Sequence, residues 1–229
     1  MKPIIGIIGR YESVYDKSVI CVFDNYRKCI IKYGGIPLLI LPTQEIDYTK
    51  TKPADAPKMT DSEINDLIET LKLCNGIIMP GGTKRFEIDS FICDYCNKNN
   101  IPLLGICMGM QIMCNYNNDN KNIKIENHYE DADYKHKVKI ENNSFLYELL
   151  DTDEILVNSF HNYKVANSGS YKIAAKENDV IEAVYKDGVF NLGVQWHPEK
   201  NYDKDINSKK IIEAFIKASI SNSFLQKHL

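Results

Sequence analysis

The feature that most constrains the fold is an apolar run that ends in a cysteine between two glycines. Residues 101–106 have the composition of a buried strand, and Cys107 follows at once. Gly109 and helix-forming residues to about Asn115 come next. The pattern predicts a strand, a sharp turn at Cys107 and a helix, which is the basic unit of an α/β sheet.

The Gly-x-Cys-x-Gly sequence at this turn is the cysteine version of the Gly-x-Ser-x-Gly nucleophile elbow. Gly105 and Gly109 lack side chains, so the turn can close around Cys107. The helix directs its free N–H groups and the positive end of its dipole at the sulfur, which favours a thiolate. The N–H of Met108 would then lie where an oxyanion develops. The alternative is a structural cysteine, because free cysteines are often buried.

The first half of the chain alternates apolar strands with helical patterns. Strands are predicted at residues 4–8, 36–41, 76–80 and 101–106, and helices at residues 19–33, from 61 onward, 88–99 and 108–115. Asp61 is predicted to cap the second of these helices. Residues 43–60 are polar, contain two prolines and are predicted to form a long surface loop. Whether this loop closes over a ligand stays open.

The second half is richer in alternating and β-branched segments. Strands are predicted near residues 135–140, 154–157, 171–176, 180–185 and 190–196, and a final helix at 206–221. Lys186-Asp187-Gly188 fits a hairpin turn. No repeat or linker divides the chain, so we expect one domain over residues 1–229. The pattern predicts a doubly wound α/β fold with a mainly parallel central sheet and an antiparallel extension.

Composition narrows the classes of function. The chain has 229 residues, 44% hydrophobic and 26% charged, which is typical of a globular protein that needs no disulfide or metal to fold. A formal net charge of -3 without a long basic run argues against a nucleic-acid partner. No run approaches the roughly 20 apolar residues of a membrane span. The seven cysteines, an odd number without a secretion signal, favour free thiols in the cytoplasm.

Two glycines follow the predicted strand at residues 76–80. At the end of a parallel strand, Gly81 would permit close approach of a ligand. The N–H of Gly82 is then a candidate second donor to an oxyanion. An ordinary tight turn is the alternative.

A further apolar strand leads into His197, Pro198 and Glu199. A cysteine nucleophile needs an imidazole to take its proton, and the imidazole needs a carboxylate to orient it. Side chains two residues apart in an extended segment point the same way, so we expect His197 and Glu199 to lie together. A surface turn is the alternative.

Other polar residues give weaker signals. Asn158, Ser159 and His161 follow the predicted strand at 154–157 and can hydrogen-bond a polar substrate, although a polar loop explains them equally well. Tyr11 and Tyr15 follow the first predicted strand. They could line the mouth of a pocket or simply lie on the surface. Cys93 and Cys96 form a Cys-x-x-Cys pair on a predicted helix without a second pair at zinc spacing, so we predict no metal site there.

The order of these motifs resembles the class I glutamine amidotransferase superfamily. The resemblance rests on Pro80-Gly81-Gly82, on Gly105-Ile106-Cys107-Met108-Gly109-Met110-Gln111 and on Gly193-Val194-Gln195-Trp196-His197-Pro198-Glu199. Three further segments are similar to its γ-glutamyl-γ-aminobutyrate hydrolase (peptidase C26) branch, namely Lys2-Pro3-Ile4-Ile5-Gly6-Ile7, Gly34-Gly35-Ile36-Pro37, and His136-Lys137-Val138 with Val157-Asn158-Ser159-Phe160-His161. The resemblance spans residues 3–199.

The resemblance implies a flavodoxin-like three-layer sandwich and a Cys-His-Glu triad. Cys107 would be the nucleophile, His197 the general base and Glu199 its orienting carboxylate. Gly82 and Met108 would supply the oxyanion N–H groups, and Gln111 would help to hold a γ-glutamyl head. The residue pattern adds Gly81, Asn158, Ser159 and His161 as expected substrate contacts. No metal and no organic cofactor are implied.

The activity implied by the resemblance is hydrolysis of a small γ-glutamyl amide through a thioester, with release of glutamate and an amine. A free-standing glutaminase subunit that passes ammonia to a synthase partner is the first alternative, and a non-catalytic γ-glutamyl-ligand binding protein is the second. Members of the branch commonly carry Arg where this chain has Met108, and the segments after Gly82 and Cys114 are short. These departures mean that the identity of the released amine stays open. The sequence is also compatible with a homodimer.

Overall fold

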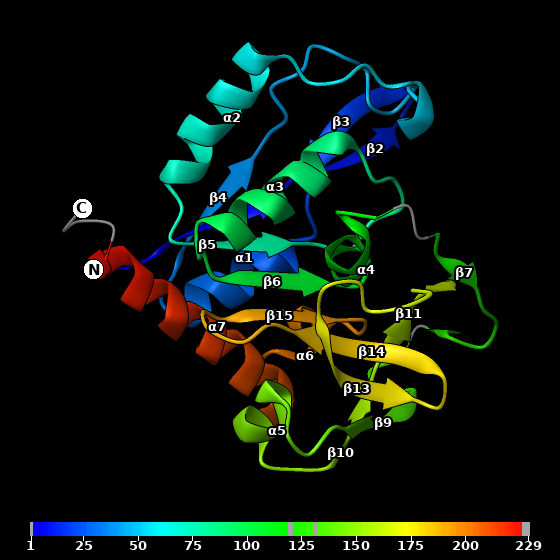
Figure 1. Ribbon diagram of the computed structural model, residues 1–229. Coiled ribbons are helices and arrows are strands. Elements are labelled where there is room, and N and C mark those ends of the chain that lie inside the picture. The colour runs from blue at the N-terminus through cyan, green and yellow to red at the C-terminus, as the bar shows by residue number, and fades with distance from the viewer. Residues whose placement is uncertain (1, 119–120, 131, 226–229) are drawn as a thin grey trace.

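Five short apolar segments pair side by side as parallel strands, as shown in the computed structural model (Figure 1), which describes residues 2–118, 121–130 and 132–225. They are β1 (Ile4–Ile8), β4 (Ile36–Ile40), β5 (Gly76–Met79), β6 (Leu103–Ile106) and β15 (Asn191–Val194). Their spatial order, β4-β1-β5-β6-β15, is the 2-1-3-4-5 order of flavodoxin-like sheets. The predicted fold class is therefore confirmed.

Four antiparallel strands continue the same sheet beyond β15. They are β14 (Val180–Tyr185), β13 (Lys172–Glu177), β9 (His136–Ile140) and β10 (Glu154–Val157), in that order outward. The predicted hairpin turn at residues 186–188 joins β14 to β15, with Gly188 at a φ of 102°. We call these four strands the antiparallel extension.

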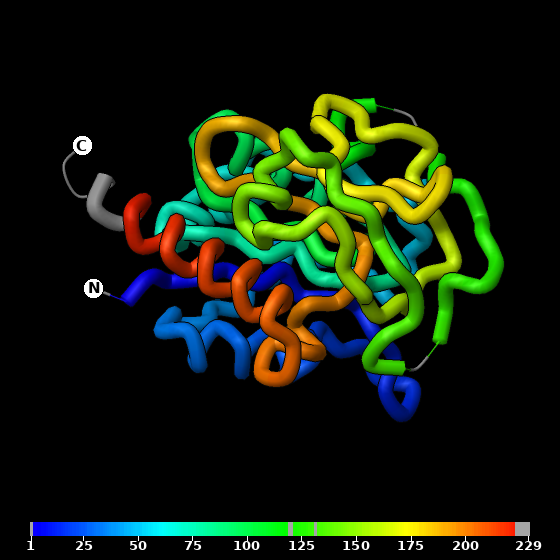
Figure 2. Tube along the Cα trace, turned by 90° about the horizontal axis from the view of Figure 1, so that it is seen from below, coloured from blue at the N-terminus to red at the C-terminus, as the bar shows by residue number. Residues whose placement is uncertain are grey.

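Helices cover both faces of the sheet (Figures 1 and 2). One face packs against α1 (Asp24–Lys32), α5 (Phe145–Leu150) and α7 (Ile206–Leu225), the other against α2 (Asp61–Lys72), α3 (Glu87–Lys98) and α4 (Met108–Asn115). Side chains of each strand alternate between the two cores. Ile77 and Met79 of β5 belong to one core, and Ile78 belongs to the other.

Two local predictions are wrong. Residues 19–33 do not form one helix, because β2 (Arg10–Val14) and β3 (Lys17–Cys21) form a hairpin before α1 begins. Tyr15 and Asp16 both have positive φ, 50° and 61°, as the two-residue turn that suits a twisted hairpin requires. The cap of α2 is Thr60 rather than Asp61, since the Thr60 hydroxyl accepts from Glu63 N and the Glu63 carboxylate accepts from Thr60 N.

Several short elements escaped prediction because they are too short to show a period. They are the 3-10 turn η1 (Pro53–Asp55), the helices α5 and α6 (Pro198–Asn201), and the paired strands β7 (Ile123–Lys124) with β12 (Tyr163–Lys164) and β8 (Tyr129–Glu130) with β11 (Ser159–Phe160). Among the described residues, no helix is both long and apolar enough to cross a membrane.

Aromatic side chains tie the polar loop at residues 43–60 to the sheet. Tyr48 in this loop is buried and stacks on Tyr11, with ring centroids 4.2 Å apart, and Phe86 packs edge-on against both. Lys84 Nζ donates to the carbonyl of Thr49 at 2.6 Å. Tyr11 is therefore part of a core and Tyr15 is 92% exposed in its turn, and neither lines the cleft that contains Cys107.

Gly109 generates a prediction about stability. A Cβ at this position would lie 1.9 Å from the carbonyl oxygen of Met79, a backbone atom that cannot move aside. We expect Gly109→Ala to lower the free energy of unfolding by at least about 3 kcal/mol, since it forces α4 off β5. As a control, Gly188→Ala meets no atom within 4 Å and should cost only about 1–2 kcal/mol of backbone strain. Urea unfolding of both variants measures the difference, and equal losses would contradict the packing argument.

Candidate active site

Three neighbouring parallel strands end at the same edge of the sheet and carry the predicted site. The register pairs Met79 of β5 with Gly105 of β6, and Ile106 of β6 with Val194 of β15. The segments that follow these strands therefore lie side by side. Ligands of open α/β sheets bind at this carboxyl edge.

Cys107 sits at a strained turn between β6 and α4. Its φ of 54° and ψ of -110° are rare for a residue with a side chain. The Cys107 N–H donates to Val194 O at 2.8 Å, and its carbonyl accepts from Gln111 N at 3.1 Å, so both ends of the turn are fixed. A Cβ on Gly105 would lie 2.2 Å from Met113 Sδ and 2.9 Å from the Gly109 carbonyl carbon. The turn thus needs its flanking glycines for space.

His197 and Glu199 meet, but not in the way the sequence suggested. His197 is the N-cap of α6, so the segment is a short helix rather than an extended strand. The first turn of this helix brings Glu199 Oε1 to 2.6 Å from His197 Nδ1. Trp196, the only tryptophan of the chain, is buried directly before them.

Gly81 lies between the imidazole and the cysteine. A Cβ at Gly81 would be 3.0 Å from His197 Cε1 and 3.5 Å from Cys107 Cβ. The glycine therefore lets the loop after β5 approach both side chains. Gly81 does not itself line the cleft described below.

The charges around His197 change its pKa. Burial alone lowers the pKa, but the negative charges of Glu199 and Cys107 outweigh burial and raise it to about 10. The imidazole therefore keeps its proton at neutral pH. A protonated imidazole at this position can donate a proton to a departing group.

The polar side chains of Asn158 and Ser159 are hydrogen-bonded to backbone groups of the protein. Asn158 holds the backbone of His197, with its Nδ2 donating to His197 O at 2.9 Å and its Oδ1 accepting from His197 N at 2.8 Å. The Ser159 hydroxyl donates to the carbonyl of His128 at 2.5 Å. Neither residue lines the cleft described below, and Asn158 positions the imidazole.

A cleft of about 410 Å³ opens above Cys107. The described residues that line it are Gly82, Thr83, Arg85, Cys107, Met108, Gln111, Ile112, Asn115, Asn122, Tyr129, Phe160, His161, Asn162 and Tyr163. Larger depressions of about 1000 and 870 Å³ lie elsewhere on the surface and away from Cys107, so size alone does not identify the site. The structure brings Gly82 and Met108 to one cleft with Cys107, as their predicted roles require.

Gln111 and His161 border the cleft with their polar atoms already directed at protein groups. Gln111 Nε2 donates to Tyr163 O at 3.0 Å and to Gln195 Oε1 at 3.1 Å, and its Oε1 accepts from Asn122 at 2.8 Å. His161 directs Nδ1 at Tyr163 O and Nε2 toward Glu182. Gln111 therefore shapes the wall rather than presenting free polar groups, whereas no hydrogen bond from the described residues reaches His161 Nε2.

Arg10 was not predicted to take part, yet it fixes the loop that carries Gly82. It follows β1 at the same sheet edge, and its guanidinium donates to Pro80 O at 2.7 Å and Gly81 O at 3.2 Å. Its Nη1 pairs with Asp89 of α3 at 2.5 Å, and both side chains are buried. The sequence signal was a charged residue directly after a buried strand.

Tyr26 was also missed, because its place on the buried stripe of α1 makes it look like a core residue. Its hydroxyl accepts the Gly81 N–H at 3.1 Å. Burial, and next the charge of Glu199, raise the pKa of Tyr26 well above its ordinary value, so the hydroxyl stays protonated. Tyr26 thus lies between the glycine loop and the carboxylate that holds His197.

Known proteins are similar to this chain in amino-acid sequence. The family model described as Peptidase C26 matches residues 79–199. A Schizosaccharomyces pombe protein that carries the name glutamine amidotransferase PB2B2.05 is 31% identical, over 85% of this chain and 81% of that protein. The Rickettsia prowazekii protein named glutamine amidotransferase-like protein RP404 is 25% identical, over 95% of this chain and 98% of that protein.

Solved structures are similar in fold. A crystal structure from Thermoplasma acidophilum, named as one subunit of a GMP synthase, has a TM-score of 0.67 at 18% identity and covers 99% of both chains. The glutaminase domain of Trypanosoma brucei CTPS with bound acivicin has a TM-score of 0.64 at 17% identity, over 96% of this chain and 94% of that one. At these identities the likeness concerns the fold alone.

The Arg10–Asp89 pair generates a prediction. Asp89→Asn removes the buried partner of Arg10 and should lower the free energy of unfolding by about 3–5 kcal/mol. Asp94→Asn is the matched control, because Asp94 lies on the same helix and pairs with Lys98 at the surface. That change should cost less than about 1 kcal/mol. Thermal and urea unfolding report both values. A loss of less than about 1 kcal/mol for Asp89→Asn would show that the Arg10–Asp89 pair is not needed for stability.

Proposed function

The chain belongs to the class I glutamine amidotransferase-like superfamily, in its peptidase C26 branch, and is a cysteine hydrolase of the glutamine amidotransferase type; from this premise we propose that it cleaves the γ-glutamyl amide bond of a small γ-glutamyl compound. The products would be glutamate and an amine. The observation that carries the proposal is the strained Cys107 in one cleft with Gly82 and Met108, next to the His197–Glu199 pair.

In the proposed acylation step, the Cys107 sulfur attacks the γ-carbonyl carbon of the substrate. The carbonyl oxygen becomes an oxyanion and accepts hydrogen bonds from the N–H groups of Gly82 and Met108. Met108 is the first residue of α4, so its N–H has no acceptor within the helix. Protonated His197 then donates its proton to the amine nitrogen as the C–N bond breaks, which leaves a γ-glutamyl thioester on Cys107.

In the proposed deacylation step, His197 is neutral and accepts a proton from water. The water oxygen attacks the thioester carbon, and the oxyanion forms again in the same place. The C–S bond breaks, glutamate leaves and the sulfur returns as the thiolate beside protonated His197. Glu199 and Asn158 position the imidazole through both steps, and Arg10 and Tyr26 position the loop of Gly82.

The cleft also supports a small acidic substrate. Its volume of about 410 Å³ is within the range of small-molecule sites. Arg85 is the one lysine or arginine among the described residues that line it, and its guanidinium is held by Ser90 Oγ at 2.7 Å and Asn115 O at 2.8 Å. We assign Arg85 to the α-carboxylate of the γ-glutamyl head, since a planar guanidinium is suited to binding a carboxylate.

A free-standing glutaminase subunit is the second candidate. One of the structures similar in fold is named as part of a GMP synthase and the other as the glutaminase domain of a CTPS. Under this alternative the substrate is glutamine, the amine is ammonia, and a synthase partner accepts it.

Glutamate release from a panel of amides tests the proposal. The panel contains glutamine, γ-glutamyl-γ-aminobutyrate, other γ-glutamyl amines and the matching amides without an α-carboxylate. We expect rapid release from one γ-glutamyl amide, weak release without the α-carboxylate, and a loss of at least about 1000-fold in Cys107→Ala and Cys107→Ser. Slow release from glutamine alone would favour the glutaminase alternative. Unchanged turnover in Cys107→Ala would exclude both mechanisms.

The pH profile of Glu199→Gln tests the role of the carboxylate. Amine release needs protonated His197, so activity should fall as pH rises through the pKa of His197, which Glu199 helps to raise. Without the carboxylate this pKa falls toward its ordinary value, so the alkaline limb of kcat/KM should move to lower pH and the rate should fall by about 100-fold or more. Asp94→Asn should keep the original profile. If the alkaline limb does not move in Glu199→Gln, Glu199 does not raise the pKa of His197.

A further inference from the structure

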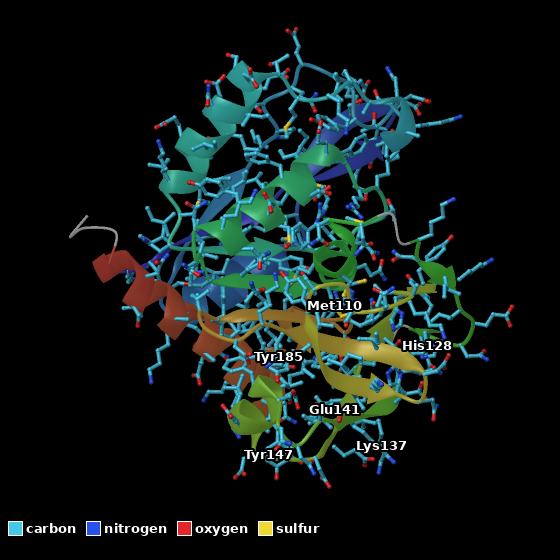
Figure 3. All side chains as sticks on the ribbon, in the orientation of Figure 1. Met110, His128, Lys137, Glu141, Tyr147 and Tyr185 are labelled. Atoms are coloured by element: carbon cyan, nitrogen blue, oxygen red, sulfur yellow. The ribbon has the colours of Figure 1, made fainter. Side chains whose placement is uncertain are left out.

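Four side chains that the proposed reaction does not use meet beside the antiparallel extension. His128 precedes β8, His136 begins β9, His161 follows β11 and Glu182 lies within β14. We call these residues the histidine cluster. Figure 3 shows His128 at the end of the sheet beside β14. His161 lines the cleft with Cys107, whereas His128, His136 and Glu182 do not line it.

The distances within the cluster suit a shared cation better than hydrogen bonds. His136 Nε2 and His161 Nε2 lie 3.4 Å and 3.6 Å from Glu182 Oε1. A hydrogen bond between an imidazolium and a carboxylate would be about 2.7–2.9 Å. Two ligands of one tetrahedral zinc ion, each about 2.0–2.1 Å from the metal, lie about 3.3 Å apart. Ligand atoms of His128, His136 and Glu182 all fall within 4.8 Å of one another.

Two of the histidines present the nitrogen that a metal needs. His128 Nδ1 lies 3.0 Å from Glu126 O, and His161 Nδ1 lies 3.1 Å from Tyr163 O. A carbonyl only accepts hydrogen bonds, so these Nδ1 atoms carry a hydrogen and Nε2 is the ring nitrogen left to face a metal. Ring orientation by a backbone carbonyl is the usual support of a metal-bound histidine.

The inward-facing atoms lack hydrogen bonds, although His128 Nε2 also lies 3.4 Å from Glu177 Oε2. Glu182 is fully buried, and no hydrogen bond from the described part of the chain reaches either of its carboxylate oxygens or the three histidine Nε2 atoms. A buried carboxylate facing imidazole lone pairs is costly unless a cation lies among them.

We propose that His128, His136 and Glu182 bind one divalent transition-metal ion, with zinc as the best match. Two imidazoles and one carboxylate form a borderline ligand set that suits zinc and permits cobalt, nickel or copper. These three ligand atoms lie within 4.8 Å of one another, whereas His161 faces Glu182 from outside this group, so a water would fill the fourth position of a tetrahedral shell. A buried histidine–glutamate ion pair that shares a proton is the competing explanation.

The metal would fasten one wall of the cleft. Its ligands come from three separate segments, and His161 N donates to His128 O at 3.0 Å where β11 pairs with β8. Tyr129 and Phe160 of these strands line the cleft, and the Phe160 ring packs edge-on against His197, with ring centroids 5.6 Å apart. The ion would thus hold the segment before β8 on the sheet. This inference does not depend on the substrate or on the reaction of Cys107.

The test must separate this site from the catalytic pair, because a thiolate and an imidazole also bind zinc. Protein without a histidine tag is therefore made in a Cys107→Ala background. Zinc stoichiometry is measured by competition with a chromophoric chelator, and the melting temperature is recorded with zinc and with EDTA. Cobalt replaces zinc in an absorption measurement.

We expect one zinc per chain, a higher melting temperature with zinc than with EDTA, and a tetrahedral cobalt spectrum without thiolate charge-transfer absorption. Adding Glu182→Gln or His136→Ala should abolish stoichiometric binding and the shift in melting temperature. The matched control His197→Ala should keep both. If Glu182→Gln does not fold, His128→Gln replaces it, since the His128 side chain is 14% exposed.

Two results would overturn the proposal. One is zinc that is bound by the native chain but lost in Cys107→Ala, which would place it on the catalytic pair. The other is a chain that takes up no stoichiometric zinc, or that takes it up equally after Glu182→Gln and His128→Gln. Either result would assign the histidine cluster to a proton-sharing ion pair.

Discussion

The left-handed backbone of Cys107 can persist only because the sheet fixes it from both sides. One hydrogen bond ties its N–H to Val194 on β15, and another ties its carbonyl to the first turn of α4. The helix in turn needs Gly105 and Gly109 to lie flat on β6 and β5. The strain at one residue is therefore carried by three strands and a helix, and every other group of the candidate site is positioned relative to that turn.

Buried carboxylates recur around this turn, and each poses the same electrostatic problem. Asp89 is neutralised by Arg10, and Glu199 by His197. Glu182 faces the imidazoles of His136 and His161 instead of an arginine, at 3.4 Å and 3.6 Å, which is longer than a charge-assisted hydrogen bond. Since a buried charge without a partner is strongly unfavourable, the proposed metal would give Glu182 what Arg10 gives Asp89.

Much of the fold could be predicted because strands and long helices show a characteristic periodicity of apolar residues in the sequence. The parallel strands, the hairpin before β15 and the helix after Cys107 all followed from alternation, spacing and glycines. The hairpin at Tyr15 escaped because no glycine marks its turn. Contacts between distant segments left no local pattern at all. Arg10 and Asp89 are 79 residues apart in the sequence. The histidine cluster is spread from residue 128 to residue 182, so its members do not form a metal-binding motif of closely spaced residues.

The place of the single tryptophan has a practical consequence. Trp196 is 2% exposed and immediately precedes His197, so the one indole of the chain sits beside the candidate catalytic pair. Intrinsic fluorescence excited at the indole therefore comes from this region alone and from no other part of the molecule. The protein carries a built-in optical reporter, through which the arrival of a ligand or the acylation of the cysteine can be followed in real time without a label.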